Sequence, residues 1–327
     1  MQTVSVVGAN GFIGGYMYSF LIDKLNGRFT IKRTCFPEHC GYLDYLDVTD
    51  IKQLRQYLLS VKPRFLILLA GTKDVKLCEK DYDFAYKLNT QPTKDIIKII
   101  EKNRIETKLL FFSSDYVFDG EKGFYKTTDT PNPNTNYGKT KLLAEKALLR
   151  SKIDFKIVRS GAVMAKGTNF FDWFTESLKK QQDIKLFSNT YFSPTPVNFL
   201  NEMVLEIIIA YDEIADRIIH IVGEKRMSRY DFGKFLSSFY KDKKATIQPE
   251  AVDFSKFTFQ KDLSLIRSDF VIEKQNVPLE SYIEKLILDV EPRYQQPLSK
   301  VVECRTKTNA KAPYATHAPK PTERISK

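Results

Sequence analysis

The stretch LLFFSSDYVFDGEKGFYKTTDTPNPNTNYGKTK, residues 109–141, contains the features from which we predict the fold. It begins with large apolar residues, which are typical of a strand buried in a parallel sheet. Ser113 and Ser114 end this strand, and a loop rich in glycine and proline follows. Regular structure resumes as a helix over residues 137–149. This order of strand, loop and helix predicts one unit of an alternating α/β fold.

Tyr137 and Lys141 lie four residues apart, so a helix presents both side chains on one face. A lysine cation favours tyrosinate and is expected to lower the tyrosine pKa. The phenol could then exchange a proton near neutral pH, while the Ser114 hydroxyl polarises a substrate carbonyl. Tyr-x-x-x-Lys alone is most often a surface pair. The strand-end serines and a glycine-rich turn near the amino terminus favour a catalytic role here.

The glycine-rich turn follows the first apolar run, TVSVVG at residues 3–8. Gly8, Gly11 and Gly14 form a G-x-x-G-x-x-G pattern, and residues 15–26 are predicted to be helical. These glycines allow a tight turn and the close approach of a pyrophosphate, which then meets the positive end of the helix dipole. Because a strand precedes the turn and a helix follows it, we favour dinucleotide binding over a turn without a ligand.

The predicted second strand, residues 30–36, indicates which dinucleotide binds. Enzymes that use NAD often carry an acidic residue at the end of this strand, where it binds the ribose 2′-hydroxyl. No acid is present in this strand, and Lys32 and Arg33 are basic. The sequence therefore favours NADPH, with NADH as the alternative.

The rest of the chain continues the alternation of strands and helices. Further strands are predicted at residues 64–71, 157–159 and 218–223, and helices at residues 51–61, capped by Thr49 or Asp50, and at 81–103. The fold class is α/β, a doubly wound parallel sheet (Rossmann) with a smaller carboxy-terminal substrate lobe. We assign residues 1–160 and the later strand to the dinucleotide-binding domain, and residues 161–290 mainly to the substrate lobe. The substrate is expected in a cleft between them.

Composition excludes several classes of protein. The four cysteines form no CxxC pair, so we predict neither a disulfide framework nor a metal site. No apolar run approaches the 18 residues of a membrane span, and the first residues form a strand rather than a signal peptide, so a cytoplasmic location is expected.

Much of the positive charge lies at the end of the chain. Residues 291–327 contain eight Lys/Arg and three Asp/Glu, a net charge of +5, which leaves +6 of the total +11 for the remainder. This tail is rich in proline and lacks periodicity, so at least residues 304–327 are predicted to be disordered. Because no nucleic-acid-binding module is visible in the body, the charge does not predict nucleic-acid binding.

Three motifs together resemble a known family. The GxxGxxG turn, SSDYVFDG at residues 113–120 and YGKTK at residues 137–141 look like those of an extended short-chain dehydrogenase/reductase. The most similar branch is the dTDP-4-dehydrorhamnose reductase family, over about residues 1–290. The resemblance implies an NAD(P)H-dependent reductase of a nucleotide-activated 4-keto-6-deoxy sugar. A homodimer is one oligomeric state that the sequence leaves open.

The resemblance also implies roles for individual residues. Ser114, Tyr137 and Lys141 take the catalytic positions, with Tyr137 as the general acid and Lys141 on the nicotinamide ribose. Substrate contacts are expected from Asp115, Tyr116, Ala162 and Asn169. The cofactor is expected to contact Gly8, Asn10, Gly11, Phe12, Ile13, Gly14, Arg33, Asp47, Val48, Ala70, Gly71, Thr72, Asn89, Ser113, Tyr137 and Lys141.

One departure from the family pattern concerns the sugar pocket. Residues 160–162 are Ser-Gly-Ala where the reductases carry Thr-Ser-Trp, so the aromatic wall is missing. Either Phe170, Phe171 or Trp173 replaces the indole, or the pocket admits a different sugar, unless these three rings only pack the lobe.

Two other functions stay open. The non-catalytic regulatory subunit of methionine adenosyltransferase resembles the same branch and keeps its motifs, so the chain could bind NADP without turnover. A sugar-nucleotide epimerase or dehydratase is the other enzyme class. Tyr116 stands where dehydratases of this superfamily carry a second acid, which favours simple reduction.

Overall fold

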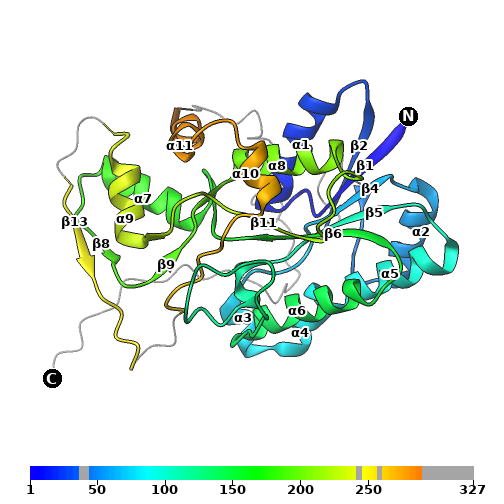
Figure 1. Ribbon diagram of the computed structural model, residues 1–327, viewed down its shortest axis with the longest axis horizontal. Helices are drawn as coiled ribbons and strands as arrows, with labels where there is room; N and C mark the ends of the chain where they lie inside the picture. Colours follow the sequence, from blue (N-terminus) through cyan, green and yellow to red (C-terminus); the bar gives the residue numbers. More distant parts are fainter. Residues whose placement is uncertain (37–43, 241–244, 256–259, 289–327) are drawn as a thin grey trace, which may run out of the picture.

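The computed structural model describes residues 1–36, 44–240, 245–255 and 260–288 (Figure 1). The predicted tail, residues 291–327, lies outside the described residues, and so do the last two residues of the predicted substrate lobe. No helix in the described part combines the length and the apolar character that a membrane span requires.

The centre of the molecule is a seven-stranded parallel sheet, which confirms the predicted fold class. The strand order is β11-β6-β5-β4-β1-β2-β3, so the order reverses beside β1 and β4, as in a dinucleotide-binding fold. The strands are β1 (Gln2–Val7), β2 (Phe29–Cys35), β3 (Asp44–Tyr45), β4 (Phe65–Leu68), β5 (Lys108–Phe112), β6 (Asp154–Ser160) and β11 (Ile218–Ile221).

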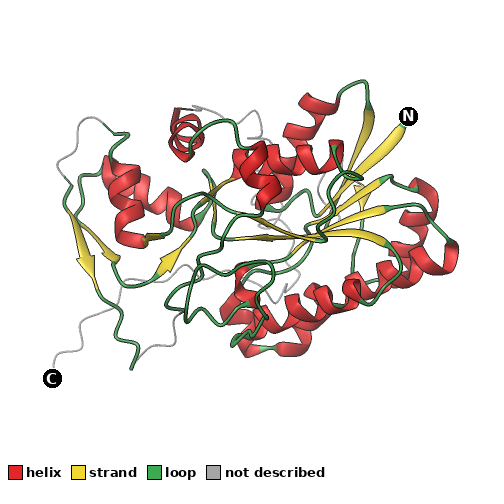
Figure 2. Cartoon of the chain, in the orientation of Figure 1, coloured by secondary structure: helices red, strands yellow, loops and turns green. Residues whose placement is uncertain are grey.

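Helices cover both faces of this sheet (Figure 2). Side chains alternate along each strand, so Val4 and Val6 pack on one set of helices while Val7 packs on the other. The first face is covered by α1 (Phe12–Leu25), α8 (Val197–Ile209) and α10 (Asp269–Lys274). The second is covered by α2 (Ile51–Val61), α5 (Gln91–Asn103) and α6 (Asn136–Leu149).

Capping and proline set several helix boundaries. The Asp50 carboxylate accepts hydrogen bonds from the amides of Lys52 and Gln53, which confirms one of the two predicted caps of α2. The single helix predicted over residues 81–103 is wrong, because α4 (Tyr82–Asn89) ends before α5 begins. Pro92 lies in the first turn of α5, where its missing N–H is tolerated, whereas inside one long helix it would remove a hydrogen bond.

A second lobe lies at the left of Figure 1 and has its own apolar core. Phe171, Phe174 and Phe232 are buried in it. Its elements are α7 (Asn169–Lys179), β8 (Ile184–Phe187), α9 (Arg229–Ser237), β13 (Ile247–Glu250) and α11 (Leu279–Leu288). Within residues 161–290, α8 and β11 instead pack in the sheet layers, so the chain passes between the two parts more than once.

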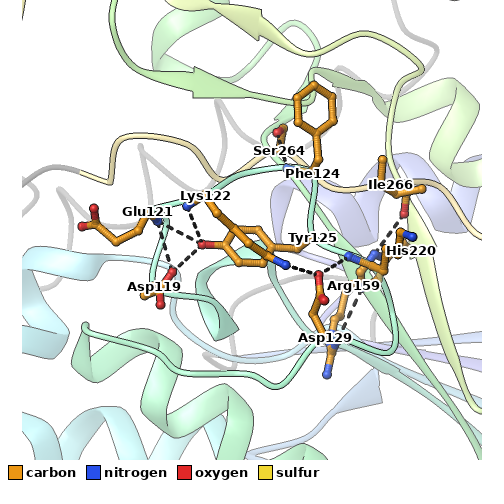
Figure 3. A network of polar contacts seen from close by, with 11 residues as sticks. Asp119, Glu121, Lys122, Phe124, Tyr125, Asp129, Arg159, His220, Ser264 and Ile266 are labelled. Atoms are coloured by element: carbon orange, nitrogen blue, oxygen red, sulfur yellow. Dashed lines mark hydrogen bonds and ion pairs between the residues drawn. The ribbon is translucent and has the colours of Figure 1, made fainter.

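The loop after β5 is fastened to a segment from near the end of the described chain. The amide of Tyr125 donates to the Ser264 carbonyl (3.0 Å), and the amide of Ile266 donates to the Tyr125 carbonyl (2.8 Å). The Phe124 amide also donates to the Ser264 hydroxyl (Figure 3). These bonds hold the loop that leads to α6.

Candidate active site

The glycine turn lies at the carboxyl end of β1. Gly8 has a φ of 89°, and a Cβ there would lie 2.7 Å from the Ala70 nitrogen, so only glycine fits. The Asn10 amide donates to the Phe36 carbonyl (2.6 Å) and joins the turn to the end of β2. At Gly11 no side chain caps α1, and its first turn contains no acid. This uncapped, positive helix end fits a pyrophosphate.

The other predicted residues of this turn serve packing as well. A Cβ at Gly14 would lie 2.2 Å from the Gly8 carbonyl oxygen, so the close packing of helix on turn requires glycine. Phe12 and Ile13 are half-buried; Ile13 packs against the sheet core, and Phe12 meets the Tyr16 ring edge to face at 5.5 Å.

The loop after β4 is tied to the catalytic helix by Asn89. The Thr72 amide donates to Asn89 Oδ1 (2.9 Å), and Asn89 Nδ2 donates to the Thr140 hydroxyl (3.2 Å). A Cβ at Gly71, whose φ is 155°, would lie 2.7 Å from the same Oδ1. Asn89 is buried, so it fixes the loop of Ala70, Gly71 and Thr72 relative to α6.

Ser114 and Tyr137 come together at the carboxyl end of β5, as predicted. The Ser114 hydroxyl donates to Asp115 (2.8 Å), and the Tyr137 ring lies edge to face with Tyr116 at 5.5 Å. Burial raises the pKa of Tyr137 because it disfavours the phenolate, and a hydrogen bond with Ser114 opposes this shift. The predicted lowering of the Tyr137 pKa is therefore wrong for this structure, and the phenol is protonated at neutral pH.

Lys141 is also buried, with its ammonium 4.6 Å from the centre of the Phe111 ring. Burial lowers the pKa of Lys141 to about 8, and the negative charge of Glu145 opposes the shift. The side chain is thus mostly charged at neutral pH, one helical turn from Tyr137. In the described part of the chain no hydrogen bond joins these two side chains.

A buried polar chain begins beside the catalytic serine. Ser113 donates to Glu145, whose carboxylate accepts two hydrogen bonds from Arg159, at 3.0 and 2.7 Å. Arg159 contacts His220 Nε2 at 3.4 Å, and Nδ1 of this histidine lies 3.0 Å from the Ile266 carbonyl (Figure 3). Because a carbonyl only accepts, we assign the proton to Nδ1, and Nε2 accepts from Arg159.

Within this series of buried polar residues, only Glu145 and Arg159 are charged, and they form an ion pair. Burial, together with the nearby Arg159 charge, lowers the pKa of His220 to about 3, so the imidazole is neutral. Sequence reasoning missed Glu145 and Arg159. The available signal was the position of Glu145, four residues after Lys141, which places it on the same helix face.

The residues predicted at the adenosine end have local partners. Both the amide and the hydroxyl of Thr49 donate to the Asp47 carboxylate at 2.8 Å, and Val48 is buried in the core under α2. Arg33 is a residue of β2, and its guanidinium lies 4.3 Å from the centre of the Tyr18 ring. The Lys32 ammonium forms an ion pair with Asp44 at 3.9 Å. Their contacts with a cofactor stay predictions.

The residues predicted to contact substrate differ in their environment. Burial raises the pKa of Asp115 to about 6 and that of Tyr116 to about 12. Ala162 is half-buried and packs against the second lobe's aromatic core. Asn169 is exposed as the first residue of α7 and makes no side-chain hydrogen bond within the described chain. These four assignments also stay predictions.

Arg229, the first residue of α9, acts electrostatically on Asp115 and Tyr116, and the sequence did not indicate it. Its guanidinium lies 4.0 Å from the Phe192 ring centre and 5.3 Å from that of Phe170. Its positive charge opposes the rise of the Asp115 pKa. Of the three aromatic candidates for the missing indole, only Phe170 contacts this arginine, whereas Phe171 is in the core and Trp173 is exposed.

The sequence and the fold are both similar to those of known proteins. The family model described as "RmlD substrate binding domain" matches residues 1–260. The chain belongs to the RmlD substrate binding domain family. It is similar to a curated "dTDP-4-dehydrorhamnose reductase" of Aggregatibacter actinomycetemcomitans, with 28% identity over 71% of this chain and 77% of that protein.

Two further relatives bear on the alternatives. The beta subunit of methionine adenosyltransferase 2 from Xenopus tropicalis is 29% identical, over 47% of this RmlD-family chain and 45% of its own length. The crystal structure of a Bacillus anthracis dTDP-4-dehydrorhamnose reductase in complex with NADP superposes with a TM-score of 0.76 at 23% identity, covering 89% of this chain and 100% of that one. This structural likeness supports the fold.

Proposed function

We propose that this RmlD-family chain is an NADPH-dependent reductase of a nucleotide-activated 4-keto-6-deoxy sugar. The observation that supports it best is that Ser114 and Tyr137 meet after β5, with Lys141 one helical turn along α6, in the same parallel sheet whose β1 leads into the uncapped start of α1. The A. actinomycetemcomitans relative is named for this reaction, and the B. anthracis neighbour binds NADP.

The residues of the chain would divide the work as follows. When bound, the dinucleotide would supply the hydride that reduces the ketone carbon. Ser114 holds the ketone oxygen by a hydrogen bond, and the Tyr137 phenol, kept protonated by burial, donates its proton to that oxygen. The Lys141 ammonium then stabilises the tyrosinate that remains. Asn89 keeps the loop of residues 70–72 in register with α6.

The test is an NADPH-oxidation assay with purified protein against a panel of 4-keto-6-deoxy nucleotide sugars. We expect loss of absorbance at about 340 nm with at least one of them. A wild-type protein that binds NADPH yet reduces none of the panel would contradict the proposal. That result would favour the alternative of a chain that binds NADP without turnover; the beta subunit of methionine adenosyltransferase 2 matches about half of this chain.

A further inference from the structure

Arg229 is a charged side chain for which the described part of the chain provides no hydrogen-bond or ion-pair partner. It is half-buried at the start of α9, yet it makes no hydrogen bond or ion pair with any described residue. Burying a charge is unfavourable unless an opposite charge or hydrogen-bonding groups compensate for it. The Asp115 carboxylate acts on this charge only through space, so groups in hydrogen-bond contact with the guanidinium are expected to come from a ligand.

Aromatic stacking holds the guanidinium in place. Its central carbon lies 4.0 Å from the Phe192 ring centre and 5.3 Å from that of Phe170, and both rings belong to the second lobe. Stacking uses the face of the guanidinium plane and leaves the N–H groups along its edge available. Such a preorganised fork matches two anionic oxygens, as in a carboxylate or a phosphate.

The position of Arg229 places this fork beside the reacting groups. Its charge acts on Asp115 and Tyr116, the two residues that follow Ser114. A Cβ on Gly161 would lie 3.6 Å from Asp115 Oδ2, so the chain at residues 161 and 162 borders the same carboxylate. Phe170 and Phe192, which Arg229 contacts, belong to the same cluster as Ala162, the residue that stands where the family carries the indole.

We propose that Arg229 determines substrate specificity by binding a pair of anionic oxygens carried by the substrate. These oxygens belong either to a carboxylate on the sugar or to the diphosphate that links the sugar to its nucleoside. The inference rests on the proposed function, because it assumes that a nucleotide sugar occupies this site. From the sequence, the sugar-binding region differed from the family only by the absence of the tryptophan at residue 162. The proposal adds a positively charged side chain to this region.

The competing structural role is that Arg229 only packs on the two rings. Arg217 provides a matched control, since its guanidinium also stacks on a ring, 5.2 Å from the centre of Phe155. Arg229→Met and Arg217→Met both keep an unbranched apolar chain over the ring and remove the charge. Arg229→Lys keeps the charge and removes the planar fork.

The experiment measures binding of thymidine, dTDP, dTDP-glucose and dTDP-glucuronate to full-length protein by calorimetry, with NADPH present. Loss of a charge-assisted pair predicts about 10- to 100-fold weaker binding to Arg229→Met. If dTDP and both sugars lose this affinity and thymidine does not, the diphosphate is the partner. If only dTDP-glucuronate loses it, the partner is a sugar carboxylate. Arg229→Lys should fall between wild type and Arg229→Met, and Arg217→Met should stay within about twofold of wild type.

Three outcomes would overturn the proposal: wild-type protein that binds none of these probes, changes below about threefold for every probe, or an equal loss for thymidine. If Arg229→Met fails to fold by circular dichroism, the comparison of wild type with Arg229→Lys decides, and equal affinities reject the role of the fork. The NADPH-oxidation assay is separate. Inactive wild-type protein whose dTDP affinity still depends on Arg229 would contradict the proposed reductase and leave this site in place.

Discussion

Two arginines, one in the sheet and one in the second lobe, have different surroundings. Arg159, on β6, is fully buried, donates two hydrogen bonds to Glu145 and contacts His220. Arg229, on the second lobe, stacks on aromatic rings and has no polar partner in the described chain. Arg159 is paired in direct contact with a carboxylate, whereas the half-buried Arg229 interacts with Asp115 only through space. The polar contacts of Arg159 are therefore complete within the sheet region, whereas those of Arg229 would be completed by the ligand that we propose.

The largest expected effect lies between these regions, at Tyr137. Tyr137→Phe removes the transferable proton and keeps the ring that packs against Tyr116. A positioned acid contributes about 10²–10⁴ in rate, so kcat should fall by that factor while NADPH affinity changes little. Stopped-flow NADPH oxidation and a fluorescence titration measure the two quantities. Unchanged kcat in the variant would show that proton transfer does not depend on this phenol.

Glu145→Ala tests whether the ion pair of Glu145 with Arg159 stabilises the sheet region. The substitution leaves Arg159 buried without its carboxylate, which should lower the free energy of unfolding by about 3–5 kcal/mol. Urea denaturation measures the loss. Arg229→Met is the control and should change stability by less than about 1 kcal/mol, because it breaks no polar contact in the protein. Equal losses in the two variants would remove the distinction between the two arginines.

Asp115 provides a pH test of the same contrast. Its pKa is raised to about 6 by burial, so the folded state holds the proton more tightly than the unfolded state, where a value of about 4 is normal. The resulting stabilisation is fully present below about pH 4 and is lost as the pH rises through about 6. Between these limits wild type should lose about 2–3 kcal/mol relative to Asp115→Asn.

Urea denaturation at several pH values measures this difference. In Arg229→Met the Asp115 pKa should rise further, because the arginine charge lowers it. A carbon-13 titration of the carboxyl group detects that shift. Identical Asp115 titrations in wild type and in the variant would mean that Arg229 does not act on this carboxylate.

The smallest effect is expected at Arg33. If its guanidinium leaves the Tyr18 ring to bind a 2′-phosphate, Arg33→Ala should weaken NADPH binding by about 1–3 kcal/mol and leave NADH binding unchanged. Fluorescence titrations with both dinucleotides measure this. Tighter binding of NADH than of NADPH to wild type would refute the assigned cofactor preference.

Much of the fold could be predicted because the apolar runs and the turn residues of the sequence match the strands and turns of the parallel sheet. The apolar runs became the central strands, and Gly8 and Gly14 occupy positions where a Cβ would collide with backbone. The prediction of one helix over residues 81–103 was wrong because the helical pattern of apolar residues continues across Thr90. In the structure the first helix ends at Asn89, and Pro92 lies in the first turn of the next one. The place of α8 on the sheet depends on tertiary packing, which its apolar pattern does not specify.

The site was predicted where its residues lie close in sequence. Ser114, Tyr137 and Lys141 share one stretch, and the structure brings them together. Their electrostatics were not predictable in the same way, because spacing reveals a lysine near a tyrosine but not the burial that outweighs it. Arg229 was missed for a related reason, since its charge acts on Asp115 from the other lobe, and before the fold is known it is an ordinary residue at a helix start.

The bonds between Tyr125 and Ser264 also have a consequence for synthesis on the ribosome. The catalytic loop is made early, yet the segment that fastens it emerges only after most of the chain. Until β11 has been synthesised, β6 is an unpaired edge strand of the sheet, and Arg159 lacks its contact with His220. The nascent protein therefore carries an exposed strand while residues 161–217 are made and an unfastened catalytic loop until residue 266, a state in which chains tend to aggregate.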